Sequence, residues 1–234
     1  MLPVAILAGG LASRLRPITE TVPKALVEVA GQPFIIRQLD YLREQGVRCV
    51  VLCVGYLGDM IEAVVGDGAK FGMDVRYSPD GSTLLGTGGA LKKAVRLLDE
   101  HFFVLYGDSF LPLDFQAVHR AYLASGKDAL MTVQKNCDRG DKSNVLFTHG
   151  KLVEYNKRSP RTDMTYIDYG LGVLTAKVLF PYPSNQAFDL ADVYQALSLR
   201  GELAGMEVYE RFYEIGSHAG LHEAGIFFST KDKK

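Results

Sequence analysis

The sequence is poor in the features that would assign it to a disulfide-rich, zinc-binding or membrane class. Its 234 residues include three cysteines, Cys49, Cys53 and Cys137, which match neither a disulfide framework nor a zinc-ligand spacing. No run of about 18 uninterrupted apolar residues is present, so no transmembrane helix is expected. The apolar residues 1–7 lack the basic segment that opens a signal peptide. We therefore expect a cytoplasmic protein with reduced cysteines and no membrane partner.

An excess of charge of one sign is also absent. Lys and Arg together number 26 and Asp and Glu 27, which leaves a net charge of -1. A general nucleic-acid-binding protein is normally basic overall, so no nucleic-acid partner is expected. No internal repeat is found, and 234 residues are enough for one large domain with a substantial core. The five histidines show no metal-ligand spacing and are expected at ordinary core or surface positions.

Short β-branched runs alternate with helical patterns, which predicts an α/β fold with a mostly parallel sheet flanked by helices. In the first part of the chain we expect strands at residues 4–7, 49–54, 75–77, 102–106 and 129–133, and helices at 34–45, 57–65, 88–98 and 113–125. After residue 134 we expect a hairpin of 145–148 with 151–155, a strand at 166–174, a helix at 190–199, an extended segment at 206–215 and a helical turn or two at 219–224. Residues 229–234 are expected to be a charged tail with nothing to bury.

A loop rich in glycine and cations follows the first strand, with the sequence LAGGLASRLRPITETVPKAL at residues 7–26. Gly9 and Gly10 let the backbone turn tightly and bring its amides close to anionic oxygens. Arg14, Arg16 and Lys24 place three cations around the same loop. This combination is typical of a polyphosphate site. The alternative is an ordinary strand–helix connection whose basic residues are solvated.

Two common nucleotide-binding motifs are absent from the sequence. Gly81 and Gly86 have the spacing of a P-loop, but Thr87 stands at the position of the required lysine. Gly9 and Gly10 are not followed by the third glycine of a dinucleotide-binding fingerprint. Both motifs are therefore excluded.

Six blocks of the sequence carry a resemblance to a known family. They are LAGGLASRLRP with Val22-Pro23-Lys24, LLGTGGAL at 84–91, LYGDSF at 105–110, YNKR at 155–158, YIDYGLGVL at 166–174 and FYEIGSHAGL at 212–221. Together they resemble the sugar-1-phosphate nucleotidyltransferases, also called nucleotide-sugar pyrophosphorylases. The likeness is greatest to short bacterial members without a C-terminal β-helix, such as heptose-1-phosphate guanylyltransferases and muramic-acid-1-phosphate uridylyltransferases.

The resemblance implies a fold and a reaction. The fold is the nucleotide-diphospho-sugar transferase fold, a Rossmann-like mixed sheet, in a single domain over residues 1–228. Residues 1–134 would form the nucleotide-binding half and residues 135–228 the sugar-phosphate-binding half. The reaction is Mg²⁺-dependent transfer of a nucleotidyl group from an NTP to a sugar 1-phosphate, with release of pyrophosphate. GTP and a cell-envelope sugar such as a heptose are the favoured substrates, and a homodimer is the oligomer considered.

The resemblance also implies roles for individual residues. The expected nucleotide-binding residues are Ala8, Gly9, Gly10, Arg14, Lys24, Asp80, Gly86 and Thr87. The expected catalytic residues are Arg14, Lys24, Asp108 and Lys157. The expected sugar-phosphate-binding residues are Gly107, Asn156, Lys157, Asp168 and Gly170.

Asp108 and Glu214 are the expected magnesium ligands. Asp108 follows a predicted central strand, where a hard carboxylate suits Mg²⁺ with phosphate oxygens and water. Glu214 stands where the family has an aspartate, so its arm is one methylene longer. The alternatives are that Asp108 caps a turn and that Glu214 is a surface or hydrogen-bonding residue.

The expected sugar pocket departs from the family pattern. Lys157 matches the family's phosphate-gripping lysine, but Asn156 replaces its acidic neighbour and Arg158 replaces a proline, and Lys157 could instead be an ordinary exposed lysine. Asp168 stands where the family often has asparagine, and Asn144 replaces a frequent glycine. These changes leave the identity of the sugar open.

Several alternatives remain at the level of the sequence. The carboxylate of Asp80 could accept hydrogen bonds from guanine or uracil, or it could be a turn residue after Pro79. A glycosyltransferase is a rival function, although Asp108-Ser109-Phe110 lacks the second carboxylate of a D-x-D motif. Further rivals are a non-catalytic nucleotide-sugar sensor and a cytidylyl- or uridylyltransferase that acts on phosphocholine or muramic acid 1-phosphate.

Overall fold

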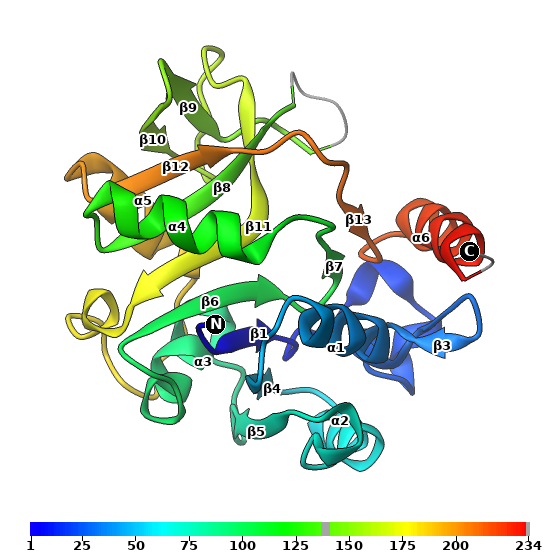
Figure 1. Cartoon of the computed structure of the whole chain (residues 1–234). Helices are drawn as coiled ribbons and strands as arrows, with labels where there is room; N and C mark the ends of the chain where they lie inside the picture. Colours follow the sequence, from blue (N-terminus) through cyan, green and yellow to red (C-terminus); the bar gives the residue numbers. More distant parts are fainter. Residues whose placement is uncertain (137–140, 233–234) are drawn as a thin grey trace.

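The first strand of the chain, β1 (Val4–Leu7), lies inside a mixed sheet in the computed structural model, which describes residues 1–136 and 141–232 (Figure 1). Within these residues the sheet has nine strands, in the order β10-β9-β11-β6-β1-β4-β5, with β8 paired to β11 and β12 paired to β8. The other eight strands are β4 (Cys49–Val54), β5 (Asp74–Pro79), β6 (His101–Tyr106), β8 (Ala129–Lys135), β9 (Val145–Thr148), β10 (Lys151–Tyr155), β11 (Tyr166–Thr175) and β12 (Leu203–Glu207).

The parallel part of the sheet positions the candidate site. β6, β1, β4 and β5 pair in parallel, so their carboxyl ends meet at one edge. β1, β4 and most of β6 are apolar runs because both of their faces are buried: Val4 and Ile6 belong to one core cluster and Ala5 to another. β5, at the edge of the sheet, alternates buried and exposed residues instead. The chain passes from β1 to β4 on one side and later to β6 on the other. This reversal makes a switch point beside β1, where open α/β sheets bind ligands.

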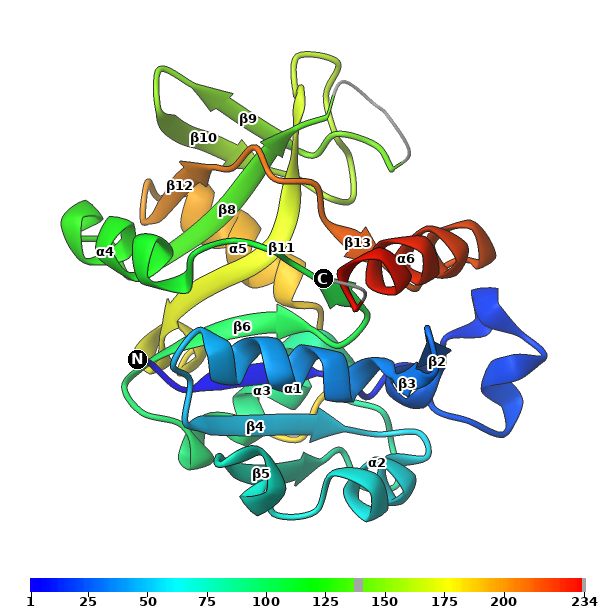
Figure 2. The same ribbon diagram turned by 45° about the vertical axis from the view of Figure 1, so that its right-hand side comes forward.

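Strand β11 joins the second half of the chain to the first (Figure 2). It runs antiparallel to β6 along one edge and antiparallel to β8 along the other. The register with β8 shifts between Asp168 and Gly172, and Gly170 within this bulge has a φ of +107°, which favours glycine. The expected hairpin is confirmed: β9 and β10 pair around His149 and Gly150, whose φ values of 49° and 72° suit a tight turn.

Helices cover both faces of the sheet (Figure 2). They are α1 (Phe34–Glu44), α2 (Gly58–Val65), α3 (Gly86–Ala94), α4 (Phe115–Ser125), α5 (Leu190–Leu199) and α6 (His218–Lys231). Apolar residues of α1, α2 and α4 share a core cluster with Ile6 on one face of the sheet. Apolar residues of α5 and Leu91 of α3 share a cluster with Ala5 on the opposite face, and other residues of α3 form a small cluster with β4. The expected α/β architecture, a mixed and mostly parallel sheet between helices, is confirmed.

Two small pairings were not expected from the sequence. β2 (Glu28–Val29) pairs with β3 (Gln32–Pro33), and β7 (Ser109–Phe110) pairs with β13 (Tyr213–Glu214). A strand of two residues has no alternating pattern to detect. The second pairing matters because it brings residue 214 beside the end of β6.

The C-terminal helix is longer than expected. α6 extends to Lys231, so residues 229–231 form its last turn rather than a tail. Its fully buried residues, Gly220, Ala224 and Phe228, repeat every four positions and are too few to mark a long helix in the sequence. Arg37 of α1 fixes the helix end through hydrogen bonds of 3.1 and 2.9 Å to the Asp232 carboxylate. Residues 233–234 lie outside the described part.

Cys49 and Cys53 lie on β4 as free thiols, and Cys137 lies outside the described residues. Burial raises the pKa of Cys53 to about 12, so this thiol stays protonated near neutral pH. In residues 1–136 and 141–232 no helix has the length and apolar character needed to cross a bilayer.

Candidate active site

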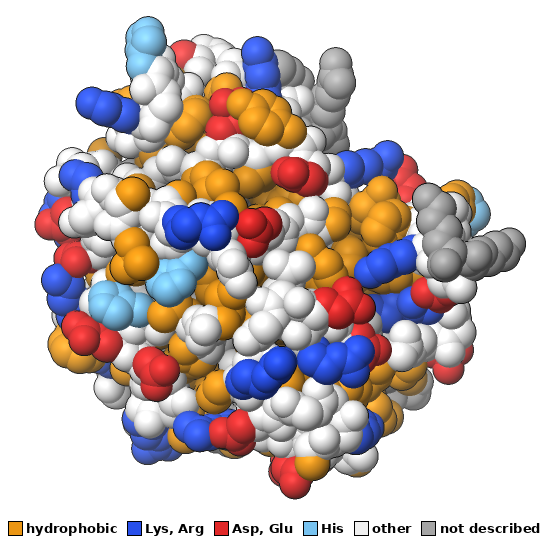
Figure 3. Space-filling model, in the orientation of Figure 1, with side chains coloured by type: hydrophobic (Ala, Val, Ile, Leu, Met, Phe, Trp, Pro, Cys, Tyr) orange, Lys and Arg blue, Asp and Glu red, His pale blue; other side chains and the backbone are white. Residues whose placement is uncertain are grey.

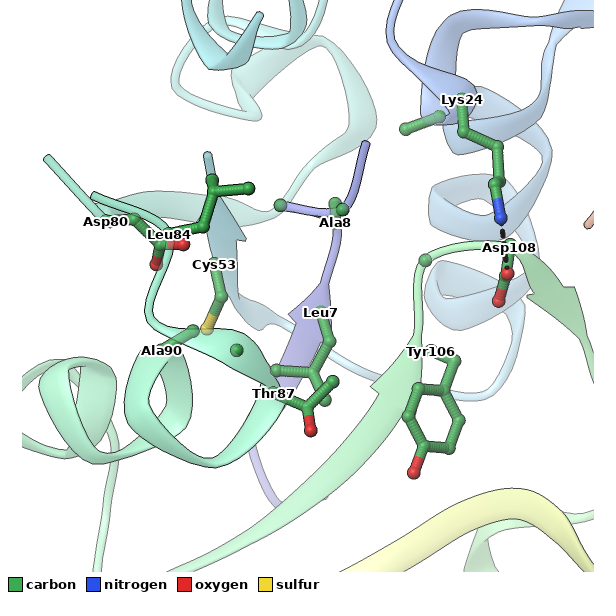
Figure 4. A pocket seen from close by; sticks show the side chains of 15 residues that line it. Leu7, Ala8, Lys24, Cys53, Asp80, Leu84, Thr87, Ala90, Tyr106 and Asp108 are labelled. Atoms are coloured by element: carbon green, nitrogen blue, oxygen red, sulfur yellow. Dashed lines mark hydrogen bonds and ion pairs between the residues drawn. The ribbon is translucent and has the colours of Figure 1, made fainter. Parts of the chain in front are cut away.

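A cavity of about 240 Å³ opens at the carboxyl ends of β1, β4 and β6. Its wall is made of Leu7, Ala8, Gly9, Gly10, Lys24, Ala25, Cys53, Asp80, Leu84, Gly86, Thr87, Ala90, Tyr106, Gly107 and Asp108. Lys24 and Asp108 lie on one side, and Asp80, Leu84 and Cys53 lie on the other, with Ala8 between them (Figure 4). This position is the switch point of the parallel strands.

Three glycines around β1 serve different purposes. A Cβ added to Gly9 would lie 3.1 Å from the backbone nitrogen of Gly55, and one added to Gly107 would lie 2.8 Å from the carbonyl oxygen of Leu7. These two positions therefore need glycine for close backbone packing. A Cβ on Gly10 would have no atom within 4 Å. Gly10 borders free space in the cavity wall, where a ligand can approach the backbone.

Lys24 and Asp108 form an ion pair of 2.9 Å although 84 residues separate them. Lys24 begins a short 3-10 helix that is anchored by the buried residues Ala25 and Leu26. Asp108 follows Gly107 at the end of β6. The two side chains are only 19% and 29% exposed, so the pair is held at the cavity wall rather than in open solvent. A phosphate could take the place of the carboxylate as the partner of the ammonium group.

Arg14 does not line the cavity, unlike Lys24. It lies in a 3-10 helix, Ser13–Leu15, and its side chain is exposed. A Cβ added to Gly216 would lie 3.0 Å from its Nη2 atom, which places the guanidinium beside the start of α6. The described residues provide no ion-pair partner for it.

Asp80 lies buried in the cavity wall, where its carboxylate supports the loop before α3. Its Oδ2 atom accepts a hydrogen bond of 3.1 Å from the Leu85 amide and so holds the loop before α3. Its Oδ1 atom is buried and has no hydrogen-bond partner among the described residues. Burial raises the pKa of Asp80, although the Leu85 amide and Lys93 act in the opposite direction. A buried acceptor without a partner is suited to a donor from a ligand.

The glycines of LLGTGGAL serve packing within the protein. A Cβ on Gly86 would lie 2.7 Å from the Phe188 carbonyl oxygen, and one on Gly88 would lie 2.3 Å from the Phe188 ring. The amides of Gly88 and Gly89 donate to the same carbonyl at 3.0 and 3.3 Å. At Gly88 and Gly89 the structure brings the segment before α5 against the start of α3.

Thr87 lines the cavity, but its hydroxyl group is already used. It donates to Asp189 Oδ1 at 2.7 Å and accepts from the Leu190 amide at 2.8 Å. Asp189 also caps α5 through the Ala191 amide at 3.0 Å. Its second oxygen lies 3.5 Å from Lys157 Nζ. The expected acceptor-phosphate lysine is thus connected to the cavity wall through one carboxylate.

Asp168 and Gly170 lie in the bulge of β11. The Asp168 amide donates to Asn144 Oδ1 at 3.0 Å, and its own Oδ1 atom accepts from the Gly170 amide at 2.9 Å. Burial raises the pKa of Asp168 to about 6, while the Gly170 amide and Lys157 act to lower it. Burial and the nearby charges of Asp168 and Asp189 raise the pKa of Tyr106, so this cavity residue keeps its proton.

The side-chain oxygen of Asn156 is used within its own loop, because Oδ1 accepts a hydrogen bond from the Ser159 amide at 2.9 Å. Its backbone amide donates to the Asn144 carbonyl at 2.8 Å. The two asparagines that distinguish this chain from the family pattern therefore support the loop and the bulge.

The backbone of Glu214 lies close to that of Asp108, but the Glu214 side chain points to the start of α6. Glu214 pairs with Ser109 across β7 and β13, and the Ile215 amide donates to the Asp108 carbonyl at 2.9 Å. The Glu214 carboxylate accepts from the Gly216 amide and, at 3.0 Å, from the Ser217 hydroxyl. Ser217 in turn caps α6 through the Gly220 amide at 3.1 Å.

The residues fit Mg²⁺ in part. Asp108 offers a partly exposed carboxylate in a cavity that has room for phosphate oxygens, which are the ligands this ion prefers. Glu214 in this arrangement directs both oxygens to the start of α6. Within residues 1–136 and 141–232 no group of three or more His, Cys, Asp or Glu side chains is arranged so that it could hold a metal ion.

Tyr106 and Asp189 were missed by the sequence analysis. Asp189 directly precedes the expected helix at 190–199, which is the pattern of an N-cap, so a capping role could have been inferred. Its contacts with Thr87 and Lys157 join three segments that are distant in sequence, so no local sequence pattern predicts them.

Comparison with known proteins gives a consistent result. A model described as Nucleotidyl transferase matches residues 4–142. A mannose-1-phosphate guanylyltransferase catalytic subunit beta from Xenopus tropicalis is 29% identical over 217 residues, which are 90% of this chain and 60% of that protein. An N-acetylmuramate alpha-1-phosphate uridylyltransferase from Neisseria meningitidis is 40% identical over 113 residues, 48% of this chain and 49% of that one. The chain thus spans about 60% or less of the length of these relatives.

Solved structures with the same fold extend over nearly the whole chain. HddC from Yersinia pseudotuberculosis, solved with GMP-PN, has a TM-score of 0.81 and 26% identity and covers 97% of this chain and 100% of that one. A putative glucose-1-phosphate thymidylyltransferase from Bacillus anthracis has a TM-score of 0.86 over 97% of this chain and 95% of that one. Its identity of 22% supports the fold alone. Because the family model covers more than half of its residues, this chain belongs to the nucleotidyl transferase family.

Proposed function

We propose that this protein transfers a nucleotidyl group from an NTP to a sugar 1-phosphate and releases pyrophosphate. The observation that carries the proposal is the cavity at the switch point, which combines the Lys24–Asp108 pair with the buried acceptor of Asp80. Asp189 connects Thr87 in the wall of this cavity to Lys157. Lys24 lines this cavity and Lys157 is connected to its wall through Asp189, so we assign one phosphorylated substrate to each lysine.

In this reaction an oxygen of the acceptor phosphate attacks the α-phosphorus of the NTP in line. One phosphorus–oxygen bond forms, the bond between the α-phosphorus and the bridging oxygen breaks, and pyrophosphate leaves. The chain contributes positioning and charge stabilisation rather than a covalent nucleophile. Ala8, Gly9 and Gly10 seat the nucleotide, Lys24 and Arg14 neutralise the polyphosphate, and Lys157 orients the acceptor phosphate.

Asp108 is the residue best suited to hold Mg²⁺, with Glu214 as a second ligand if its side chain leaves the start of α6. When bound, Mg²⁺ would neutralise charge on the phosphate oxygens. Residues 1–134 act as the nucleotide-binding half and residues 135–228 as the acceptor half of a single domain. Gly107, Asn156, Asp168 and Gly170 border the acceptor side.

We infer that GTP is the preferred nucleotide. The relatives include mannose-1-phosphate guanylyltransferases, and HddC was solved with a guanine nucleotide analogue. The unpartnered Oδ1 atom of Asp80 is a suitable acceptor for the N1–H or N2–H₂ donors of guanine. A uracil N3–H would satisfy the same atom, and uridylyltransferases are also among the relatives.

The test is pyrophosphate release in the presence of Mg²⁺, with four NTPs crossed against sugar 1-phosphates and phosphocholine. We expect release with GTP and with one class of sugar 1-phosphate. Release with a different NTP alone would reject the guanine preference. A glycosidic product with released NDP would identify a glycosyltransferase, and tight nucleotide binding without any turnover would identify a sensor.

A further inference from the structure

The start of α5 carries a carboxylate, Asp189, that has no role of its own in the proposed reaction. Asp189 accepts from the Thr87 hydroxyl at 2.7 Å and from the Ala191 amide at 3.0 Å through Oδ1. Its Oδ2 atom lies 3.5 Å from Lys157 Nζ. One side chain thus contacts α3, its own helix and the loop after β10.

Asp189 is fixed to the cavity wall by the segment that precedes it. The Phe188 carbonyl accepts from the Gly88 and Gly89 amides at 3.0 and 3.3 Å, and the Phe188 amide donates to the Leu85 carbonyl at 3.1 Å. The Phe188 ring stacks on Tyr182 with centroids 4.9 Å apart. The Lys157 side chain, by contrast, is 53% exposed in a loop. Asp189 is therefore the rigid member of the pair and Lys157 the adjustable one.

Two carboxylates influence Lys157, and they differ in charge state. Burial raises the pKa of Asp168 to about 6, so its charge varies near neutral pH. Burial also acts on Asp189, but hydrogen bonds from Ala191 and Thr87 and the Lys157 ammonium keep its pKa below the usual value. Asp189 is thus the constant anionic partner. Ion pairs this exposed contribute little to stability, so a stabilising role does not account for the arrangement.

We propose that Asp189 is a positioning residue that directs Lys157 toward the acceptor phosphate and ties its place to the nucleotide-binding wall at Thr87. This inference rests on the proposed function. Asp189 itself does not contact the reacting atoms. It limits the positions of the Lys157 ammonium group, so that the lysine side chain loses less conformational entropy when the acceptor binds.

The test compares Asp189→Asn and Asp189→Ser with Asp192→Asn in the pyrophosphate assay. Asn and Ser both keep an oxygen for the α5 cap but remove the charge. Asp192 lies in the same helix turn and pairs with Arg158 at 2.6 Å, next to Lys157, so its variant is a matched control. Melting temperatures show whether each variant is folded, and Asp189→Ser carries the test if Asp189→Asn does not fold.

We expect both Asp189 variants to raise KM for the sugar 1-phosphate about tenfold, equivalent to about 1.4 kcal/mol. The KM for the NTP should stay unchanged, Asp192→Asn should resemble the wild type, and Asp189→Glu should recover part of the loss. An equal effect of Asp189→Asn and Asp192→Asn, or a lower acceptor KM, would overturn the inference alone. Absence of turnover in the wild type would overturn the proposed function as well.

Discussion

Lys24 and Asp108 illustrate how much of this molecule depends on pairs of residues that are remote in sequence. Lys24 directly follows Pro23, and Asp108 lies two residues after the end of β6. Each side chain is only partly exposed. Their contact neutralises two charges at the cavity wall. In the proposed reaction the ammonium group exchanges the carboxylate for phosphate oxygens, so both residues serve the ligand more than the fold.

Replacing either residue should abolish turnover without unfolding the protein. We expect Lys24→Ala and Asp108→Asn to lower kcat by about 10²–10³-fold or more, because each removes charge stabilisation of the polyphosphate. The loss of folding stability should stay within about 1 kcal/mol for a pair of this exposure. Pyrophosphate release and urea denaturation measure the two effects.

A control for this prediction is the Lys177–Asp128 pair, which has a similar distance of 2.8 Å and lies outside the cavity wall. Lys177→Ala should leave turnover unchanged. Near-normal turnover in Lys24→Ala or Asp108→Asn would contradict the roles assigned to this site.

Asp168 provides a pH-dependent prediction at the same scale. Its folded pKa of about 6 lies above the ordinary value of 3.8, so the folded protein holds this proton more tightly than the unfolded chain. The group therefore favours folding below pH 3.8, and this contribution is lost as pH rises toward and through 6. Asp168→Asn should gain stability relative to the wild type as pH rises from 4 to 7, and then level off.

Thermal unfolding between pH 4 and 8 measures this difference. Asp163→Asn is the control, since a hydrogen bond from Arg161 lowers the pKa of that carboxyl and its difference should stay flat above pH 5. A flat curve for Asp168→Asn would show that the Asp168 carboxyl does not titrate near 6.

At the scale of elements, the start of α3 determines how the two halves meet. The cluster of glycines from Gly86 to Gly89 accepts the segment before α5 at distances that a side chain would prevent. This contact fixes Asp189 beside Thr87 and so connects the start of α5 to the cavity wall. The short β7–β13 pairing likewise holds Glu214, and with it the start of α6, beside Ser109.

Two glycine substitutions in helices should have opposite effects. Gly88→Ala places a Cβ 2.3 Å from the stacked Phe188 ring and should destabilise the protein by about 1–3 kcal/mol. Gly225→Ala in α6 meets no atom within 4 Å and should stabilise it, since alanine is favoured over glycine in a helix by about 0.8–1.0 kcal/mol. Chemical denaturation of both variants checks the pair, and similar values would refute the packing role of Gly88.

At the scale of the whole molecule, positively and negatively charged residues are nearly equal in number, 26 Lys and Arg against 27 Asp and Glu. Lys and Arg alternate with Asp and Glu over the face in Figure 3, where the coloured residues form no continuous basic stripe. This agrees with the net charge of -1 and gives this face no basic surface for a polyanion. The two halves meet through β11 and through the contact of α3 with the segment before α5.

Nucleotide binding should stabilise the whole fold even without turnover. A ligand at 100 times its Kd adds about 2.7 kcal/mol to folding stability. Melting temperatures with each NTP and Mg²⁺ should therefore rise most with GTP, and Lys24→Ala should reduce the shift. A larger shift with UTP would move the proposed preference to uracil.

How far the sequence alone predicts this protein depends on the range of the interactions. Val4 to Leu7, Cys49 to Val54 and Leu190 to Leu199 were predicted as strands and a helix, because burial on one or two faces leaves a local pattern. The end of α6 was missed, since its buried residues are few and its fixation depends on Arg37. Gly9, Lys24 and Asp108 were singled out because each stands in a short block of sequence that resembles the family.

The sequence by itself determined the α/β class and the order of the longer strands and helices, because these follow from short-range periodicity. Through the resemblance that its local motifs carry, it also pointed to part of the cavity wall, including Lys24, Asp80 and Asp108. Only the tertiary structure decided that Glu214 turns to the start of α6 and that Asp189 joins Thr87 to Lys157. Side-chain direction and contacts between three distant segments are settled by packing, which no local stretch of sequence records.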